Sequence, residues 1–336
     1  MVMFVADIGG TNIRFARLTG LSSSLRDITY LKCRDFTRIE DAFLTFRKKV
    51  GYDGQLDAVS IAVAAPVKDD LVEFTNNHWT FSKSALLAEL GTKRLLVLND
   101  FTAQALAQSD PTANGNLPVI AGVPTPNAPL LIIGPGTGLG VSALLPTSAG
   151  MQPLEGEGGH VSFAPRSEAE QALYGFIRRA QGYVSAEHMV SGGGLENIYR
   201  FLIRDKPDEP EMSAPKIGAA AVAEAGPCRD AAVMMLNILG TVIANNVLTI
   251  GAWGGVVLAG GIVSQLAPLI DKSQLAARIQ KIGKESHLTT SLPVWLSVDP
   301  NAGLRGAQAG LSNALLGEGR CTPSQSKMRL HLLRLL

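Results

Sequence analysis

The chain has 336 residues, of which 46% are hydrophobic and 18% are charged, and its formal net charge is +1. This length exceeds what one hydrophobic core usually supports, so two domains are expected, and the near-neutral charge provides no basic field for nucleic acid. The three cysteines, Cys33, Cys228 and Cys321, lie far apart, which indicates neither a disulfide framework nor a zinc cluster and favours a reducing, cytoplasmic environment.

The first two predicted strands are joined by a glycine turn. Met3 to Ala6 and Ile13 to Leu18 are apolar runs, and Asp7-Ile8-Gly9-Gly10-Thr11-Asn12 lies between them. A tight turn of this kind aims backbone N–H groups and a Thr hydroxyl at phosphate oxygens. Asp7 is a charge at the end of a hydrophobic strand, which a role in holding Mg²⁺, directly or through water, would explain. The alternative is a carboxylate that caps nearby turn N–H groups.

A loop that combines amides with an aromatic side chain follows the predicted strand Ala58 to Val63. This loop runs from Thr75 to Ser82. Its amides favour a lining for a sugar pocket, with Asn76 as the candidate ligand. The alternative is a loop that is simply pinned by Trp79.

The next predicted strand ends in two polar residues. Leu95 to Leu98 is apolar, and Asn99 and Asp100 follow it directly before a predicted helix. Ligands of α/β sheets bind at such strand ends, and the positive end of a helix favours an ionised Asp. An ionised Asp100 facing a sugar hydroxyl can accept its proton as the oxygen attacks the γ-phosphate of ATP. Asn-Asp before a helix is also what an ordinary N-cap looks like.

The second half of the chain repeats the first glycine turn. Leu130 to Ile133 leads into Gly134-Pro135-Gly136-Thr137-Gly138-Leu139-Gly140, and Thr137 lies 126 residues (137 − 11) after Thr11. The register Gly-Thr-x-[Ile/Leu]-x-[Phe/Val] recurs at both places, which indicates a duplicated phosphate-binding hairpin. Two ordinary hairpin turns are the alternative. The sequence has no Walker loop and no Gly-x-Gly-x-x-Gly triplet, so neither of those nucleotide sites is expected.

Three later segments carry groups suited to a sugar or a nucleoside. Glu155-Gly156-Glu157-Gly158-Gly159-His160 offers carboxylate and imidazole groups that suit a polyol, although it also fits a flexible charged loop. Glu187 follows a helix and is either a further acceptor for a sugar hydroxyl or a solvated surface residue. Gly260-Gly261 ends a strand, where bare backbone can lie against a nucleoside or simply enter a helix.

Strands alternate with helices along the chain, which indicates an α/β architecture. Further strands are expected at Val141 to Leu144, Gly255 to Ala259 and Pro293 to Ser297. Helices are expected at Ile39 to Lys49, Lys83 to Glu89, Thr102 to Gln108, Ser167 to Gln181, Leu195 to Arg204, Ala219 to Ala225 and Gly303 to Leu316. The segment from Asp110 to Asn127, rich in Pro, Asn and Gly, is the expected interdomain boundary.

One apolar segment raises the question of a membrane. Ala231 to Ile270 carries no charge, but asparagines and glycines interrupt it, so a buried helix from Arg229 to Thr249 is expected in place of a membrane span. Because no Lys or Arg precedes Arg14, the start lacks the charged region of a secretory signal. The basic tail, residues 318–336, is expected to be frayed or loosely docked.

Taken in order, these segments resemble the bacterial glucokinase family, over nearly the whole chain from Asp7 to Gly310. The ordered set is Asp-x-Gly-Gly-Thr-Asn, Asn-Asp-Phe-Thr-Ala, Gly-x-Gly-Thr-Gly-Leu-Gly, Glu-Gly-Gly-His-Val-x-Phe-Ala-Pro, Val-Ser-Ala-Glu, Ser-Gly-x-Gly-Leu and Ala-Gly-Gly-Ile. The resemblance implies the two-domain, actin-like and ribonuclease-H-like α/β ATPase fold, with a sugar and nucleotide cleft between the domains. It implies a small domain (1–110) completed by a C-terminal helix (300–317), a large domain (111–299) and a tail (318–336).

The resemblance also implies transfer of the ATP γ-phosphate to the 6-hydroxyl of D-glucose in a cytoplasmic enzyme that needs Mg²⁺ and is commonly a homodimer. Asp100 is then the catalytic base. The implied sugar ligands are Asn99, Glu157, His160 and Glu187, together with Asp100, and the amide-rich loop adds Asn76 as a candidate. The implied ligands of the phosphates and Mg²⁺ are Asp7, Gly9, Gly10, Thr11, Asn12, Gly136, Thr137 and Gly138, with Gly260 and Gly261 near the nucleoside.

One departure from related sugar kinases is informative. The related repressor-and-kinase enzymes carry a Cys/His zinc motif after the Glu-x-Gly-His segment, and this chain does not, which places it in the zinc-free group. Three alternatives stay open: a kinase of another hexose, which single hydroxyl positions decide, a non-catalytic sugar sensor or repressor, and an actin- or chaperone-like ATPase. The sensor is disfavoured because Asp7 leaves no room upstream for a helix-turn-helix, and the ATPase leaves the Glu157, His160 and Glu187 set unexplained.

Overall fold

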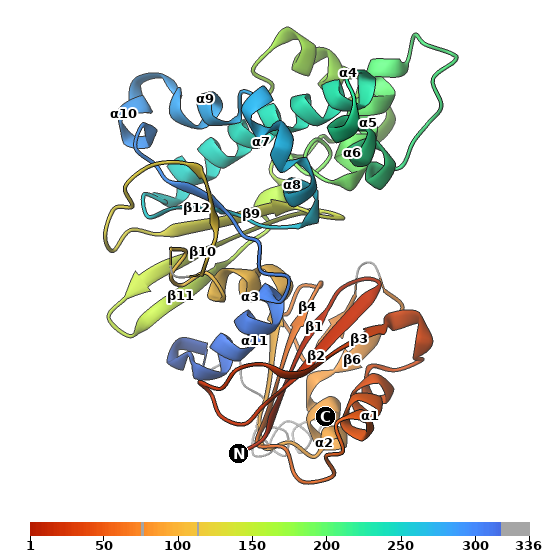
Figure 1. Cartoon of the computed structure of the whole chain (residues 1–336), viewed down its shortest axis with the longest axis vertical. Helices are drawn as coiled ribbons and strands as arrows, with labels where there is room; N and C mark the ends of the chain where they lie inside the picture. Colours follow the sequence, from red (N-terminus) through yellow and green to blue (C-terminus); the bar gives the residue numbers. More distant parts are fainter. Residues whose placement is uncertain (75–76, 113, 317–336) are drawn as a thin grey trace, which may run out of the picture. The chain divides into compact units, whose positions relative to one another are not determined.

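The structure is a computed structural model, and it describes residues 1–74, 77–112 and 114–316. The chain divides into two compact units (Figure 1). Unit 1 contains Met1–Ser109, Thr147–Pro153 and the described residues from Pro300 on, and unit 2 contains Asp110–Pro146 and Leu154–Asp299. The predicted Asn76 lies outside the described residues.

Unit 1 is built on a five-stranded sheet with the order β3-β2-β1-β4-β7. Its strands are β1 (Met3–Ile8), β2 (Asn12–Leu18), β3 (Arg26–Lys32), β4 (Ala58–Val63) and β7 (Leu95–Asn99). β2 runs antiparallel to β1 and to β3, whereas β1, β4 and β7 are parallel to one another. A small ribbon of β5 (Leu71–Glu73) and β6 (Thr80–Ser82) lies outside this sheet.

Helices cover both faces of the unit 1 sheet (Figure 1). Helices α1 (Ile39–Lys49) and α2 (Lys83–Leu90) bury the face that carries Phe4 and Phe15. Phe15 stacks on Phe46 of α1 with ring centroids 4.9 Å apart, a contact worth more than its buried area alone. Helices α3 (Asp100–Leu106) and α11 (Ala302–Ser312) lie on the other face.

Unit 2 is built on strands of a six-stranded sheet with the order β11-β10-β9-β12-β13-β8, whose edge strand β11 falls largely in the Thr147–Pro153 segment of unit 1. The strands are β8 (Leu117–Ile120), β9 (Leu130–Pro135), β10 (Leu139–Thr147), β11 (Gly150–Glu155), β12 (Gly255–Leu258) and β13 (Val294–Leu296). β10 pairs antiparallel with β9, and β12 pairs parallel with β9. The same arrangement of a hairpin beside a parallel strand occurs at β2, β1 and β4, so the structure confirms the duplicated hairpin predicted from the two glycine turns.

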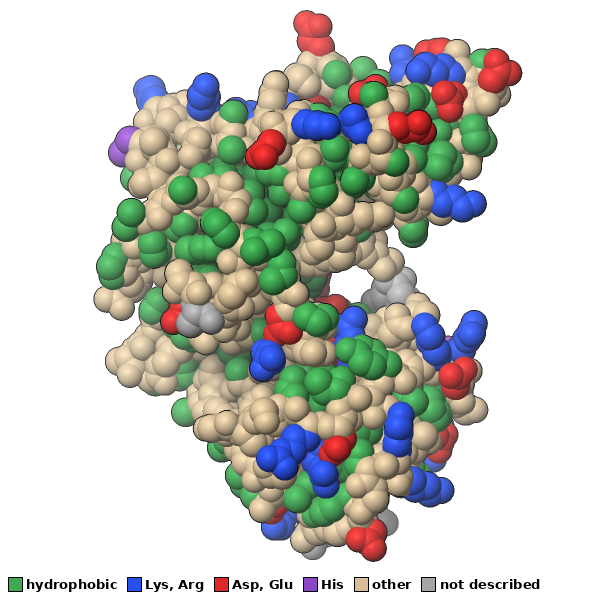
Figure 2. Space-filling model, viewed as in Figure 1, with side chains coloured by type: hydrophobic (Ala, Val, Ile, Leu, Met, Phe, Trp, Pro, Cys, Tyr) green, Lys and Arg blue, Asp and Glu red, His purple; other side chains and the backbone are tan. Residues whose placement is uncertain are grey.

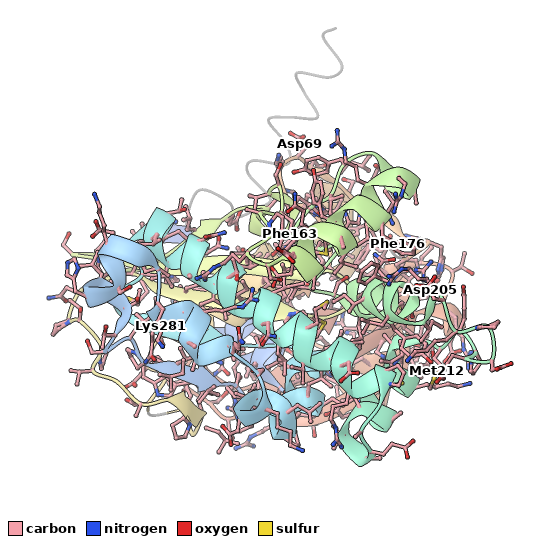
Figure 3. All side chains as sticks on the ribbon, turned by 90° about the horizontal axis from the view of Figure 1, so that it is seen from above. Asp69, Phe163, Phe176, Asp205, Met212 and Lys281 are labelled. Carbon is pink, nitrogen blue, oxygen red and sulfur yellow. The ribbon has the colours of Figure 1, made fainter. Side chains whose placement is uncertain are left out.

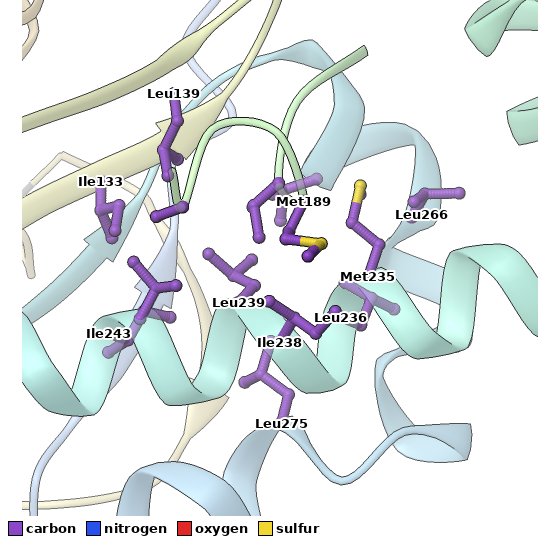
Figure 4. Close-up of a cluster of buried hydrophobic side chains, with 14 of the residues drawn as sticks. Ile133, Leu139, Met189, Met235, Leu236, Ile238, Leu239, Ile243, Leu266 and Leu275 are labelled. Atoms are coloured by element: carbon purple, nitrogen blue, oxygen red, sulfur yellow. The ribbon is translucent and has the colours of Figure 1, made fainter. Parts of the chain in front are cut away.

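A layer of helices covers the unit 2 sheet (Figure 1). The helices are α4 (Glu168–Gln181), α5 (Gly192–Ile203), α6 (Ala214–Ala223), α7 (Pro227–Ile250), α8 (Gly261–Leu266), α9 (Leu275–Gln280) and α10 (Ser286–Thr289). Figure 3 shows this layer from above, where Phe176 of α4 packs at a tilt against Phe201 of α5 with ring centroids 5.7 Å apart. In Figure 4, side chains of α7 meet Ile133 of β9 and Leu139 of β10 in one buried cluster.

The short 3₁₀ helices mark turns between these elements. They are η1 (Cys33–Asp35), η2 (Gly158–His160), η3 (Ala267–Lys272), η4 (Gly283–Glu285) and η5 (Ala314–Leu316). The face drawn in Figure 2 shows Lys and Arg interspersed with Asp and Glu, as the net charge of +1 leads one to expect.

The apolar segment predicted as a buried helix is α7. Among the described residues it is the one helix long and apolar enough to cross a membrane, and 56% of its most apolar window is buried inside the chain's own fold. Core helices of this kind pass the same test of length and composition. The prediction of a helix followed by a core strand is confirmed, since β12 follows directly.

The segment from Asp110 to Asn127, expected to be a boundary loop, was incompletely predicted because it contains β8. This strand pairs antiparallel with β13 at the edge of the unit 2 sheet. Its residues are mostly exposed, and Pro118 removes one backbone donor. Prolines are tolerated in edge strands, whose outer groups face solvent, so the strand has no buried apolar run that sequence reading could detect.

Candidate functional site

The first glycine turn joins β1 to β2 and positions Asp7 against Arg14. The two residues are register partners across the hairpin, and Arg14 Nη1 donates to Asp7 Oδ2 over 2.8 Å. The backbone N–H of Gly9 donates to the carbonyl of Asn12 over 3.0 Å, which closes the turn and leaves Thr11 and Asn12 exposed. The Asn12 side chain accepts from Lys32 Nζ over 2.7 Å.

The Asp7 carboxylate is crowded from behind by α11. A Cβ atom added to Gly303 would lie 2.5 Å from Asp7 Cγ, so only glycine lets the helix approach this closely. The Asp7 side chain is 13% exposed. Burial raises the pKa of the Asp7 carboxyl above its usual value, and the Arg14 guanidinium opposes that rise. Asp7 therefore depends on Arg14 for its ionised form, a partner that sequence reading missed although the hairpin register could have revealed it.

Asn99 and Asp100 lie at the same edge of the sheet, where β7 ends and α3 begins. Ile8, Val63 and Asn99 are aligned across the three parallel strands, so the end of β7 lies two strand spacings from the end of β1. Asn99 Oδ1 accepts from the N–H groups of Phe101 and Thr102, and Asn99 Nδ2 donates to the carbonyl of Ala65. Asn99 is therefore the N-cap, and Asp100 is the first residue of α3.

The Asp100 carboxylate is oriented locally. Its Oδ1 accepts from the N–H of Phe101 over 2.9 Å, and the side chain is partly buried. Asn99 Oδ1 accepts from the same Phe101 N–H, so both side chains bond the first turn of α3, and the interpretation of the pair as a cap stays open for Asp100.

The second glycine turn joins β9 to β10 in unit 2. Gly136 N–H donates to the Gly138 carbonyl over 2.7 Å, and the carbonyl of Gly136 accepts from Gly192 N–H over 2.9 Å. Thr137 is exposed at the tip, like Thr11 in the first turn. Leu139 N–H donates to Oε2 of Glu187 over 2.7 Å, a link that nothing in the sequence pattern predicts.

Glu157, His160 and Glu187 come together in unit 2. His160 Nε2 lies 4.0 Å from Glu157 Oε2 and 3.9 Å from Glu187 Oε2. His160 ends η2, and Glu187 is brought beside it because Glu187 N–H donates to the Gly159 carbonyl over 2.8 Å. Two carboxylates around an imidazole form a set of acceptors and donors suited to sugar hydroxyls.

The diglycine after β12 has a local structural role in the backbone. Gly260 has φ of +92°, and a Cβ added there would lie 2.6 Å from the carbonyl oxygen of Pro135. Gly260 is the N-cap of α8, which starts at Gly261. The helix-entry interpretation therefore holds locally, while the bare backbone beside Pro135 places both glycines next to the second turn.

Metal ligands are few. Among residues 1–74, 77–112 and 114–316, no group of three or more His, Cys, Asp or Glu side chains could hold a metal ion. Mg²⁺ in phosphate-transfer sites is typically held by one or two carboxylates together with substrate phosphates, and the single carboxylate of Asp7 beside a glycine turn is compatible with that mode of binding.

Comparison with known proteins gives a consistent assignment. The glucokinase family profile matches residues 4–314. The glucokinase of Helicobacter pylori strain ATCC 700392 is 40% identical over 324 residues, which cover 93% of this chain and 96% of that protein. A glucokinase from an Antarctic psychrotroph superposes with a TM-score of 0.83 at 29% identity, covering 93% of this chain and 99% of the other.

A more distant structure shares the fold. The ROK family glucokinase of Streptomyces griseus, solved in complex with glucose and AMPPNP, has a TM-score of 0.63 at 20% identity, covering 92% of this chain and 98% of the other.

Proposed function

The chain belongs to the glucokinase family and has its two-domain, actin-like ATPase fold, and we propose that it transfers the ATP γ-phosphate to the 6-hydroxyl of D-glucose. The products are glucose 6-phosphate and ADP. The observation that carries this proposal is the family match over residues 4–314, within which each unit presents one glycine-threonine turn and unit 2 brings Glu157, His160 and Glu187 together. This pairing explains both turns and the Glu157, His160 and Glu187 set at once.

Asp100 is the proposed base. The 6-hydroxyl donates its proton to the Asp100 carboxylate while its oxygen forms a bond to the γ-phosphorus. The bond from that phosphorus to the bridging oxygen breaks, and ADP leaves with the electron pair. The first-turn N–H groups of α3 favour the ionised carboxylate, and the bond from Phe101 N–H fixes its orientation.

The two glycine turns are the proposed phosphate ligands. Their exposed threonines, Thr11 and Thr137, and the turn N–H groups stabilise charge on the phosphate oxygens. Mg²⁺, when bound, supplies further charge neutralisation. Asp7, whose Oδ2 is engaged by Arg14, would be the residue that holds the metal, directly or through water.

The sugar is the proposed partner of Glu157, His160 and Glu187, with Asn99 and Asn76 as further ligands. Asn99 Oδ1 already accepts from two backbone N–H groups, and Nδ2 already donates to the Ala65 carbonyl. Asn99 would therefore bind the sugar only by sharing these atoms. Gly260 and Gly261 are the proposed neighbours of the nucleoside.

We further propose a cytoplasmic homodimer that needs no zinc and supplies glucose 6-phosphate to glycolysis. The separated cysteines support the cytoplasmic assignment. Light scattering on the purified chain tests the dimer, and activity after zinc chelation tests the independence from zinc.

The decisive experiment measures ADP release across a panel of hexoses and without sugar. Glucokinase activity predicts release that depends on glucose and is weaker with mannose, fructose and N-acetylglucosamine. A stronger response to one of those sugars would reassign the substrate. Release without any sugar would favour an ATPase, and tight sugar binding without release would favour a sensor.

A further inference from the structure

The Glu187 carboxylate lies between two groups of residues in unit 2. Its Oε2 accepts from Leu139 N–H over 2.7 Å, directly after the β9–β10 glycine turn. The same oxygen lies 3.9 Å from His160 Nε2. One side chain therefore touches both the proposed phosphate turn and the proposed sugar ligands.

The chain around Glu187 is fixed on both sides by main-chain bonds. Glu187 N–H donates to the Gly159 carbonyl over 2.8 Å, and Gly192 N–H donates to the Gly136 carbonyl over 2.9 Å. Ser191 Oγ donates to the Glu187 carbonyl over 2.8 Å. These bonds restrict the backbone of Glu187, from which the side chain extends to Leu139. The carboxylate can therefore orient the N–H group of Leu139.

Leu139 transmits this constraint to the turn. Its side chain is buried, and in Figure 4 it points into the same apolar cluster as Met189, two residues after Glu187. A backbone N–H that leaves water at such a position needs an acceptor. The carboxylate provides one, and a charged acceptor makes a stronger bond than a neutral one.

Gly138 shows how closely the carboxylate packs on the turn. A Cβ added there would lie 2.4 Å from Glu187 Oε2 and 3.2 Å from its Cδ. The neighbouring Gly136 differs, because a Cβ at that position would meet nothing within 4 Å. A Cβ at position 138 would therefore displace the Glu187 carboxylate, the end of a flexible side chain, from its place against the turn.

We propose that Glu187 is a positioning residue for the β9–β10 phosphate turn, in addition to its proposed contact with the sugar. The N–H groups of Gly136 and Leu139 already donate to Gly138 and Glu187, so those of Thr137 and Gly138 are the proposed phosphate donors. The carboxylate holds the turn in the arrangement that presents these two groups, so nucleotide affinity depends on Glu187 even when no sugar is present. This inference rests on the proposed function, since it assigns a second task to one of its sugar ligands.

Calorimetric titration of the full chain with AMPPNP and Mg²⁺, in the absence of sugar, tests this directly. Glu187→Ala is expected to weaken nucleotide binding about tenfold or more, the effect of losing a hydrogen bond to a charged group. Glu187→Gln is expected to bind the nucleotide nearly as well as the unmodified chain, because its amide oxygen still accepts from Leu139 N–H, while its glucose affinity falls.

The matched control is Glu157→Ala. Glu157 is the other carboxylate beside His160, and within the described part of the chain its ion-pair partner is that imidazole, so nucleotide affinity without sugar should not change. Equal nucleotide affinities for Glu187→Ala and Glu157→Ala would overturn the proposal. Glucose affinity, measured in parallel, should fall in both variants.

A second pair of variants keeps the test independent of folding defects at position 187. Gly138→Ala should weaken nucleotide binding in the unmodified chain by displacing the carboxylate, yet add little in a Glu187→Ala background, where the displaced group is gone. Additive losses, or unchanged binding by Gly138→Ala alone, would contradict the proposal. Thermal melts of the unmodified chain, the two single variants Gly138→Ala and Glu187→Ala, and the double variant identify any protein that has simply lost its fold.

Failure of this inference is distinguishable from failure of the proposed function. If the unmodified chain binds no AMPPNP, the nucleotide half of the proposed function is wrong. If it binds AMPPNP and releases ADP with glucose, but Glu187→Ala binds AMPPNP equally well, only the positioning role is wrong.

Discussion

Arg14 Nη1 and Asp7 Oδ2 lie 2.8 Å apart across the β1–β2 hairpin, so the acid at the first glycine turn is already paired with a cation of its own strand pair. Asp7 is 13% exposed and Arg14 is 37% exposed at the side chain. The exposure of the pair is therefore intermediate between that of a surface salt bridge and that of a buried one. Its loss should mainly affect Asp7, the more buried partner.

Arg14→Ala should lower the free energy of unfolding by on the order of 1–2 kcal/mol, a value discounted for the exposure of Arg14. The cause is that Asp7 keeps its burial and loses its counter-charge. Urea denaturation at neutral pH measures the change. The double variant Asp7→Asn/Arg14→Ala should recover part of the loss, and a cycle with no coupling between the two positions would contradict the pairing.

Asp100→Asn should keep glucose binding and lose roughly 10²–10⁴-fold in kcat, the usual range for a positioned base. The amide has nearly the shape of the carboxylate but cannot take the proton of the 6-hydroxyl. A coupled ADP assay measures turnover, and calorimetry measures glucose affinity. Turnover close to that of the unmodified chain would rule out Asp100 as the base.

Gly306→Ala should destabilise the fold by about 1–3 kcal/mol, as overpacking usually does. A Cβ at this position would overlap the carbonyl oxygen of Ala103, where α11 crosses α3, and backbone cannot move aside as a flexible side chain can. Thermal unfolding measures the change. Gly175→Ala is the control, since a Cβ there meets nothing within 4 Å, and this substitution within α4 should stabilise by up to about 1 kcal/mol.

Asp70 should make the fold lose stability in acid. Burial raises the pKa of its carboxyl, but bonds from Ser82 Oγ, Ser84 N–H and Ser84 Oγ outweigh this and hold the pKa below its usual value of 3.8. A lowered pKa in the folded state means that stability is present above pH 3.8 and is lost as pH falls through the folded value. Asp70→Asn should show a smaller loss of unfolding free energy between pH 5 and pH 3, and identical acid profiles would exclude the effect.

Elements with a clear buried pattern could be predicted from sequence almost to the residue. Helix α1 and strand β4 have the predicted bounds, Ile39–Lys49 and Ala58–Val63. The reason is that the apolar residues of each element face a core. Strands β3 and β11 were not predicted. Both lie at sheet edges and are largely exposed, so neither has the apolar alternation on which such a prediction depends.

Helix starts were placed less well than helix interiors. Helix α5 was predicted from Leu195 but begins at Gly192, because Ser191 caps it by accepting from Gly194 N–H and three glycines conceal the first turn. Helix α3 was predicted from Thr102 and begins at Asp100, since Asn99 is the cap.

The site was predictable where it depends on motifs and not where it depends on register. The glycine-threonine turns and the acids near His160 follow from local sequence. The Arg14 partner of Asp7 depends on hairpin register, and the bond from Leu139 to Glu187 joins residues 48 positions apart. The roles of the site residues, and the extent of the two domains, stay predictions.

Because α11 lies late in the chain, the order in which the chain is synthesised affects when it can become active. Gly303 backs Asp7 and Gly306 meets the helix that begins with Asp100, so residues near the end of the chain complete a unit begun at its start. A nascent polypeptide that has left the ribosome only as far as Asp299 contains every proposed ligand, yet it lacks the helix that packs against Asp7 and against α3. We expect such a polypeptide to stay inactive until α11 has been synthesised and has packed, which would keep a partly made chain from consuming ATP.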